Sequence, residues 1–299
     1  MSDAPPDLLV ETLGIETRAW QYGDPSGFPL ILVHGFRGDH HGLEGMALRL
    51  AERMPGVRAI VPDLPGFGET PAIPGRAHDL DLFGDWLRAF AAAAAPQGFA
   101  ILGHSFGSLV VANSLARGLA PQTVTLVNPI SAPALEGPQA FMTQLAIAYY
   151  WAADHLPERA ARALLGNPLI VRAMSIVMAK TNDPGLRAWI HGQHAEYFSR
   201  FADTGSLLQA FRASVSHTVR QYASSITEPT LLVVGDRDDI TPLAEQLSLQ
   251  QRLADAQLRV MPGVGHLVHY EAVEPSTAEI ESFLRQHLSA ATATAGEAA

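Results

Sequence analysis

Short apolar runs that carry few charges recur along the chain, and longer stretches with a helical spacing of apolar residues separate them. Runs of this kind are typical of strands covered on both faces, because such a strand has no side that must face water. The alternation predicts an α/β fold in which helices lie on both faces of a largely parallel sheet. The predicted strands are Leu30–Val33, Val57–Val61, Phe99–Leu102, Val124–Val127, Thr230–Val234 and Leu258–Met261.

Helical patterns occupy the stretches between these runs. Residues 8–22 precede the first run and are predicted to form two further strands. One arrangement places these two strands antiparallel at an edge of the sheet. Asp79 and Asp81 lie near the start of the second helix, where carboxylates complement the helix dipole. The predicted helices are Asp39–Arg53, His78–Ala95, Ser108–Arg117, Pro242–Ala254 and Glu274–His287.

The alternation stops in the segment 131–225. This segment has a helical pattern and holds ten of the 22 aromatic residues of the 299-residue chain. We therefore predict a helical cap at 131–225, inserted into a core made of 8–130 and 226–288. The aromatic side chains either line an apolar underside of the cap or form the cap's own core. Those that we predict to bind substrate are Tyr149, Trp151 and Trp189.

The composition narrows the class of partner. The formal net charge is −10 and no run of basic residues occurs, which argues against nucleic acid or an anionic membrane as the main partner. We expect a small-molecule substrate and a monomer or homodimer. The absence of cysteine excludes disulfides, thiolate zinc sites and cysteine nucleophiles, and it fits a reducing cytoplasm. The low-complexity tail, 289–299, is predicted to be disordered.

No targeting or membrane-spanning segment is predicted. Residues 1–7 lack the basic region and apolar stretch of a signal peptide. The apolar stretch Gly98–Ala116 contains three glycines and has the pattern of a strand, a turn and a helix. The stretch Ala140–Ala153 is shorter than the roughly 20 residues that a spanning helix needs. We therefore expect a soluble, cytoplasmic protein without membrane insertion.

The segment Gly103-His104-Ser105-Phe106-Gly107 follows an apolar strand and precedes a helix with small residues. In this setting the G-x-S-x-G pattern is typical of a nucleophile elbow, a tight turn that presents a serine between strand and helix. Glycines are needed where the strand and the helix nearly touch. We predict that Ser105 is a nucleophile; the alternative is an ordinary glycine-rich turn.

A serine nucleophile needs a base, and the base needs a carboxylate that orients it. Three aspartates follow the predicted strand Thr230–Val234. Asp238 is predicted to be the acid because it lies on the loop between this strand and the next helix, and Asp236 is the second choice. Asp239 is expected to cap the following helix.

The base is predicted from its place after the last strand. His266 lies in a loop that contains glycines, and such a loop can carry an imidazole over the carboxyl edge of the sheet. His269 is instead expected to pack at a helix start, and His287 is expected to lie in solvent on the terminal helix.

An oxyanion hole needs two donors. We predict the backbone N–H groups of Phe106, the residue after the nucleophile, and of Phe36, in the loop after the strand Leu30–Val33. The side chains of Phe36 and His34 are predicted to contact substrate. Alternatively, His34 and Gly35 only shape this turn.

Taken in order, five motifs resemble those of the α/β-hydrolase superfamily over residues 8–288. The resemblance implies an eight-stranded, mostly parallel sheet with a cap inserted after the sixth strand, and a triad of Ser105, Asp238 and His266. Relatives with an aspartate nucleophile act on epoxides or haloalkanes, and the serine here argues against both. The motifs are His34-Gly35-Phe36, Asp63-Leu64-Pro65-Gly66-Phe67-Gly68, Gly103-His104-Ser105-Phe106-Gly107, Gly235-Asp236-Arg237-Asp238 and Gly265-His266.

Two histidine pairs are weaker signals, and only one of them has a spacing that suits metal binding. His191 and His194 can share one face of a helix, but no third ligand is evident, and the pair His40-His41 is better explained by pocket polarity. We expect no metal site. The glycines around Gly66 and Gly68 lack a third partner, so a dinucleotide site is not predicted.

These observations lead to one functional hypothesis and two alternatives. The hypothesis is cleavage of a small or medium apolar carboxylic ester through an acyl-enzyme, with no cofactor. The first alternative is carbon–carbon hydrolysis of diketone acids, or lactone hydrolysis, on the same triad. The second is a ligand receptor that retains the triad but turns over little. Basic residues in the pocket would favour an acid substrate, and the candidates are Arg37, Arg172, Arg187, Arg200 and Arg212.

Overall fold

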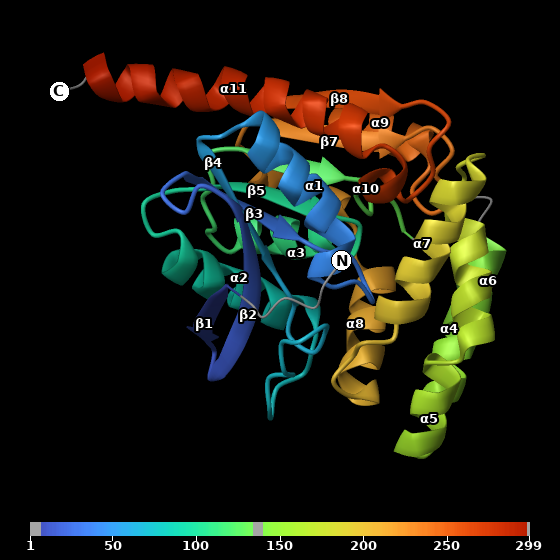
Figure 1. Cartoon of the computed structure of the whole chain (residues 1–299). Helices are drawn as coiled ribbons and strands as arrows, with labels where there is room; N and C mark the ends of the chain where they lie inside the picture. Colours follow the sequence, from blue (N-terminus) through green and yellow to red (C-terminus); the bar gives the residue numbers. More distant parts are fainter. Residues whose placement is uncertain (1–6, 134–139, 298–299) are drawn as a thin grey trace.

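The computed structural model describes residues 7–133 and 140–297. An eight-stranded sheet with the strand order β1-β2-β4-β3-β5-β6-β7-β8 forms its centre (Figure 1). The pairs β1–β2 and β2–β4 are antiparallel and all other neighbours are parallel, so the predicted, mostly parallel α/β sheet is confirmed. The strands are β1 (Leu8–Thr12), β2 (Ile15–Gly23), β3 (Phe28–Val33), β4 (Val57–Pro62), β5 (Ala100–His104), β6 (Val124–Val127), β7 (Thr230–Gly235) and β8 (Ala256–Met261).

Helices cover both faces of this sheet. In β3, the side chains of Leu30 and Leu32 pack with α1 and α11, whereas Ile31 and Val33 pack with α2 and α3 on the other face. This alternation follows from the two-residue period of a strand. The helices are α1 (His40–Arg53), α2 (Leu80–Ala94), α3 (Phe106–Ala116), α4 (Ala140–Asp154), α5 (Glu158–Leu165), α6 (Pro168–Met178), α7 (Pro184–Tyr197), α8 (Thr204–Ser216), a 3-10 helix (Val219–Ser225), α9 (Leu243–Gln250), α10 (Val268–Glu271) and α11 (Val273–Glu297).

The chain between β6 and β7 is helical. It contains α4 to α8 and the 3-10 helix, and Figure 1 shows α4 to α7 beside the sheet rather than on its two covered faces. Backbone hydrogen bonds link this segment to the core: the Gly68 N–H donates to the Arg200 carbonyl, and the Ala202 N–H to the Gly66 carbonyl, both at 3.0 Å. Residues 134–139 of the predicted cap lie outside the described residues, and its boundaries at 131 and 225 stay a prediction.

Several helical elements differ from the sequence prediction, and α9 ends at Gln250 instead of Ala254. Helix α3 begins at Phe106 instead of Ser108, because the turn at Ser105 leads directly into the helix. The short helix α10 was not predicted. Helix α11 continues to Glu297, through most of the tail for which we expected disorder. The tail is rich in alanine, which has the highest helix propensity, and lacks proline; residues 298–299 lie outside the described part.

One helical stretch of the described chain, Glu158–Met178, is long and apolar enough to span a membrane by length and composition. It is not one uninterrupted helix, since Asn167 lies between α5 and α6 and caps the second of them. Only 22% of its apolar window is buried. The stretch Gly98–Ala116, by contrast, forms β5 and α3, which are buried in the core.

Candidate active site

Ser105 lies between β5 and α3 at a backbone turn with a φ of +51° and a ψ of −116°. Residues with side chains rarely adopt a positive φ, so this turn is strained. The two glycines let the backbone segments around this turn approach closely. A Cβ added to Gly107 would lie 2.2 Å from the Val33 carbonyl oxygen, and a Cβ added to Gly103 would lie 2.7 Å from the Gly107 carbonyl oxygen, and both distances are too short for a side chain. The Ser105 N–H donates to the Val127 carbonyl at 3.0 Å, which ties the turn to β6.

One hydrogen-bond chain joins Ser105, His266 and Asp238. The distance from His266 Nε2 to Ser105 Oγ is 2.8 Å, and that from His266 Nδ1 to Asp238 Oδ2 is also 2.8 Å. Asp238 follows β7 and His266 follows β8, so all three residues come from the carboxyl ends of parallel strands. When Nδ1–H donates to the carboxylate, Nε2 is left to accept the Ser105 hydroxyl proton.

The Asp238 carboxylate accepts hydrogen bonds from several donors besides His266. Asn128 Nδ2 donates to Oδ2 at 2.7 Å and Thr241 Oγ1 donates to Oδ2 at 2.5 Å, while the N–H groups of Ile240 and Thr241 donate to Oδ1. Burial opposes ionisation of this carboxyl, but the facing His266 and the bonds from Thr241 outweigh it and lower the pKa of Asp238 to about 2. The carboxylate is therefore ionised at neutral pH.

The two neighbouring aspartates have other partners. Asp236 accepts a hydrogen bond from the Gly263 N–H at 2.7 Å, and Asp239 forms an ion pair with Lys180 Nζ at 2.5 Å. The expectation that Asp239 caps the next helix is wrong, because α9 begins without a side-chain cap. The N–H groups that precede α9 bond to Asp238 instead.

His34 is buried in the loop after β3. Its Nδ1 donates to the Gly35 carbonyl at 2.9 Å, and its Nε2 accepts from the Leu64 N–H at 2.9 Å. Burial lowers the pKa of His34, so the ring stays neutral. Because backbone groups occupy both nitrogens, the geometry favours a role in shaping the turn over the substrate contact that we predicted.

Sequence reasoning missed His104, which precedes Ser105. Its Nε2 is 3.2 Å from the His266 carbonyl oxygen, and its ring packs on His269 with 4.0 Å between centroids. Burial, followed by the nearby His266, lowers the pKa of His104 to about 3. A neutral imidazole that donates to this carbonyl holds the backbone of His266. No local pattern marks such a contact, because 162 positions separate the two residues.

The two predicted oxyanion donors lie on adjoining segments. Phe106 is the first residue of α3, where a helix leaves its N–H groups without an intrahelical acceptor. The loop that contains Phe36 lies against the same turn, because a Cβ on Gly35 would be 3.2 Å from Ser105 Cβ. The donor roles of Phe36 and Phe106 stay predictions.

The Phe36 ring lies under the helical segment. It contacts Tyr150 and Phe211 of that segment, with 5.8 and 5.9 Å between centroids, and Phe67 and Phe106 of the core at 6.1 and 6.4 Å. The aromatic side chains that meet Phe36 are therefore Tyr150 and Phe211 rather than the three that we selected from the sequence.

Those three side chains lie elsewhere on the same segment. Tyr149 is half-buried, and its hydroxyl donates to the Leu164 carbonyl at 3.0 Å. Trp151 is 61% exposed and its ring packs on His155. Trp189 is 41% exposed and its ring meets Tyr270 edge-on. Their contacts with substrate stay predictions.

The arginines considered for an acid substrate are separated in space. Arg37 is buried and its guanidinium bonds to the helical segment. Arg200 lies over the Tyr197 ring and Arg212 pairs with Asp154. The remaining two, Arg172 and Arg187, line a hollow between α6 and α7.

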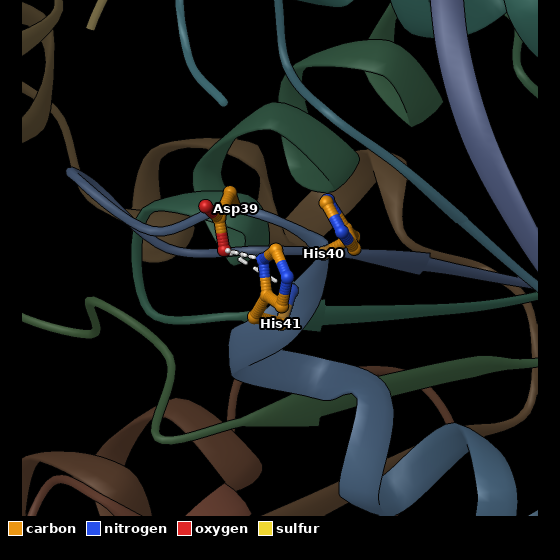
Figure 2. A group of neighbouring side chains, drawn as sticks. All are labelled: Asp39, His40 and His41. Carbon is orange, nitrogen blue, oxygen red and sulfur yellow. Dashed lines mark hydrogen bonds and ion pairs between the residues drawn. The ribbon is translucent and has the colours of Figure 1, made fainter. Parts of the chain in front are cut away.

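Figure 2 shows a cluster at the start of α1, formed by Asp39, His40 and His41, whose ligand atoms lie within 4.8 Å of one another. Asp39 caps the helix and accepts from the His41 N–H and from His41 Nδ1, at 3.1 and 3.2 Å. His40 Nδ1 lies 3.0 Å from Asp63 Oδ1. The His41 ring stacks on Tyr197 of α7 at 3.8 Å, so this histidine pair packs between the core and α7.

The second histidine pair shares a hydroxyl. His191 Nδ1 and His194 Nδ1 lie 2.5 and 2.7 Å from Ser175 Oγ of α6. Both rings lie on one face of α7, as their spacing predicted, and that face is turned toward α6. Burial is the main cause that lowers the pKa of both imidazoles; the Arg172 and Arg187 charges add to it at His191, and the nearby His191 adds to it at His194.

Comparison with known proteins places the chain in a family. A family model described as the Alpha/beta hydrolase family matches residues 30–277. A dihydrolipoyllysine-residue acetyltransferase component of the acetoin cleaving system from Pseudomonas putida is 28% identical, over 96% of this chain and 71% of that protein. A pimeloyl-[acyl-carrier protein] methyl ester esterase from Neisseria meningitidis is 28% identical, over 81% of this chain and 88% of that protein.

Solved structures agree on the fold. The esterase from Thermogutta terrifontis superposes with a TM-score of 0.74 at 24% identity, over 94% of this chain and 99% of that one. The family model spans most of the chain, including the segments that carry Ser105, Asp238 and His266. The chain therefore belongs to the alpha/beta hydrolase family, as an esterase-like hydrolase.

Proposed function

We propose that the chain cleaves small or medium apolar carboxylic esters through an acyl-enzyme. Ser105 is the nucleophile, His266 the general base and Asp238 the residue that orients His266. The observation that carries the proposal is the hydrogen-bond chain from Ser105 Oγ through His266 to Asp238, with 2.8 Å at each step. A chain of this kind activates a hydroxyl that is otherwise a weak nucleophile.

The first half of the reaction transfers the acyl group. His266 Nε2 takes the proton of Ser105 Oγ as the oxygen attacks the ester carbonyl carbon. The tetrahedral intermediate carries its negative charge on the former carbonyl oxygen, which the N–H groups of Phe36 and Phe106 stabilise. The bond to the leaving oxygen breaks, His266 returns the proton to it, and the alcohol departs.

The second half releases the acid. His266 takes a proton from a water molecule, whose oxygen attacks the acyl carbon, and the new intermediate expels Ser105 Oγ with the proton that His266 returns. The ionised Asp238 stabilises the imidazolium that forms in each half and holds the tautomer that keeps Nε2 facing Ser105. The low pKa of Asp238 keeps this carboxylate ionised at neutral pH.

Two findings support an apolar ester as the substrate. Aromatic rings surround Phe36, the residue of the proposed oxyanion donor, so a bound acyl group would meet apolar surface. Relatives that cover most of this chain include the methyl ester esterase of Neisseria meningitidis and a lipase of Psychrobacter immobilis.

A rate comparison on a substrate panel tests the proposal. The panel holds nitrophenyl esters of increasing acyl length, lactones and diketone acids, so that the alternative reactions on the same triad are measured together. We expect turnover of the short apolar esters and a loss of roughly 10³-fold to 10⁶-fold in Ser105→Ala. Ser108→Ala is the matched control, because this neighbouring serine donates a hydrogen bond to the Ser105 carbonyl. Its loss should lower the rate about tenfold or less.

Covalent labelling provides a second readout that does not depend on the chosen substrate. A fluorophosphonate should lose fluoride and bond to Ser105 Oγ, and mass spectrometry should find the label on that peptide alone. Full activity in Ser105→Ala, or labelling at another serine, would contradict the proposed mechanism.

A further inference from the structure

A hollow of about 390 Å³ lies between α6 and α7. Arg172 and Ile176 line it from α6, Arg187 and His191 line it from α7, and Ala179, which follows α6, completes the lining. In each helix the two lining residues are four positions apart, so they lie on one face. None of the three residues of the proposed triad takes part in the lining.

The charges in this hollow are all of one sign. Arg172 and Arg187 are exposed, and within the described residues neither forms an ion pair with a carboxylate. Arg187 is oriented by hydrogen bonds from Nε and Nη2 to the Thr181 carbonyl, the first at 3.0 Å. Burial lowers the pKa of His191, and the nearby charges of Arg172 and Arg187 lower it further. Like charges around one hollow repel each other, and a bound anion would relieve that repulsion.

His191 adds a buried hydrogen-bonding group, since its side chain is 5% exposed. The Ser175 hydroxyl lies between the Nδ1 atoms of His191 and His194, and it can donate to only one of them. When it donates to His191, that neutral ring carries its own proton on Nε2. The ring that lines the hollow then presents an N–H donor without needing a positive charge.

The rim of the hollow is apolar on the α6 side. Leu169 is 79% exposed and Ile176 is 57% exposed, and with Arg172 between them they form one stripe along the helix. Exposed apolar side chains in a contiguous group mark interaction sites more often than scattered ones do. Ile176 lines the cationic hollow, and Leu169 lies on the same face of α6, seven positions earlier.

We propose that this hollow binds an amphiphilic oxyanion, a carboxylate or phosphate group that carries an apolar chain. The oxyanion lies between Arg172, Arg187 and His191, because guanidiniums bind planar or tetrahedral oxyanions through paired N–H donors. The apolar chain lies along Leu169 and Ile176. This binding requires no ester cleavage, so it stands or falls independently of the proposed function.

Calorimetric titration of the full-length protein with octyl phosphate, octanoate and inorganic phosphate tests the site. We expect both octyl compounds to bind more tightly than inorganic phosphate, and the tighter of the two identifies the preferred head group. Arg172→Gln/Arg187→Gln should weaken octyl phosphate binding about tenfold or more. Arg159→Gln, an exposed arginine of α5 outside the hollow, is the matched control and should leave the affinity unchanged.

Further variants test the apolar part and the oxyanion-binding part of the site separately. Ile176→Ser should weaken binding of octyl phosphate but not of inorganic phosphate, and His191→Gln should weaken both. The site is disproved if the double arginine variant binds octyl phosphate as the unmodified protein does, or if Arg159→Gln weakens binding equally. Equal affinity for octyl phosphate and inorganic phosphate would overturn the role of the α6 stripe. Thermal unfolding of each variant verifies that the fold is intact.

Discussion

The Nε of Arg37 donates a hydrogen bond to the backbone carbonyl of Phe198, with 2.9 Å between the two atoms. The same guanidinium donates to the Leu165 carbonyl at 2.6 Å and to the Tyr150 hydroxyl at 3.2 Å. Leu165 ends α5 and Phe198 follows α7, so the charge lies at the carboxyl ends of two helices, where helix dipoles favour a cation. The loop that carries Phe36 is thereby tied to the helical segment above it.

Replacement of Arg37 by methionine should uncouple these elements. The variant keeps an apolar stem but removes the donors to the buried Leu165 carbonyl and the partly buried Phe198 carbonyl, so we expect the free energy of unfolding to fall by about 3 kcal/mol. Urea unfolding measures the change. Arg159→Met, at an exposed position of α5, is the control and should change it by about 0.5 kcal/mol or less. Equal effects of the two variants would contradict the structural role of Arg37.

The three aspartates after β7 allow a matched test of the proposed acid. Asp238→Asn removes the carboxylate that fixes the His266 tautomer, and the rate of ester cleavage should fall about 10⁴-fold. Asp236→Asn and Asp239→Asn change exposed carboxylates that contact Gly263 and Lys180, and each should retain the rate to within about threefold. A large loss in either exposed variant would show that the acid was assigned to the wrong residue.

Buried neutral histidines should make the fold sensitive to acid. Burial lowers the pKa of His104 to about 3 and that of His194 to about 4. In the unfolded chain a histidine binds its proton near pH 6.5. Between about pH 6.5 and 4 the unfolded state therefore holds more protons than the folded state, and the free energy of unfolding decreases as the pH is lowered. For these two residues we expect a loss of roughly 4 kcal/mol between about pH 7 and 5.

Urea unfolding at several pH values measures this dependence. His194→Gln should make it shallower, because one of the titrating groups is gone. His155→Gln, at an exposed position, should leave the slope unchanged. A free energy of unfolding that stays constant over this range would show that the buried imidazoles do not remain neutral.

The aromatic contacts of Phe36 predict how acyl specificity can be changed. Phe211 packs on both Phe36 and Tyr150, with 5.9 and 3.8 Å between centroids, so Phe211→Ala should open space beside Phe36. We expect the ratio of kcat/KM for a longer acyl ester to that for acetate to rise about tenfold. Trp151→Ala, at an exposed position, should leave the ratio unchanged. A rise of the ratio in Trp151→Ala but not in Phe211→Ala would instead place the acyl group on the outer side of α4.

Local pattern was sufficient for most of the core. Strands such as β6 and β7 are buried along their whole length, so each appears in the sequence as an apolar run whatever its neighbours are. The short helix α10 was missed, because four residues are too few to show a helical period. The low complexity of the tail predicts disorder, but its alanines favour a helix, and α11 extends into it.

By itself, the sequence determined the fold class and the place of Ser105 between a strand and a helix, because hydrophobic period and glycine spacing are local properties of the chain. Only the tertiary structure decided which side chains meet. It brought Asn128 to Asp238, and His104 to the backbone of His266. These contacts depend on how distant strands and loops are aligned across the sheet, and no spacing along the chain records that alignment.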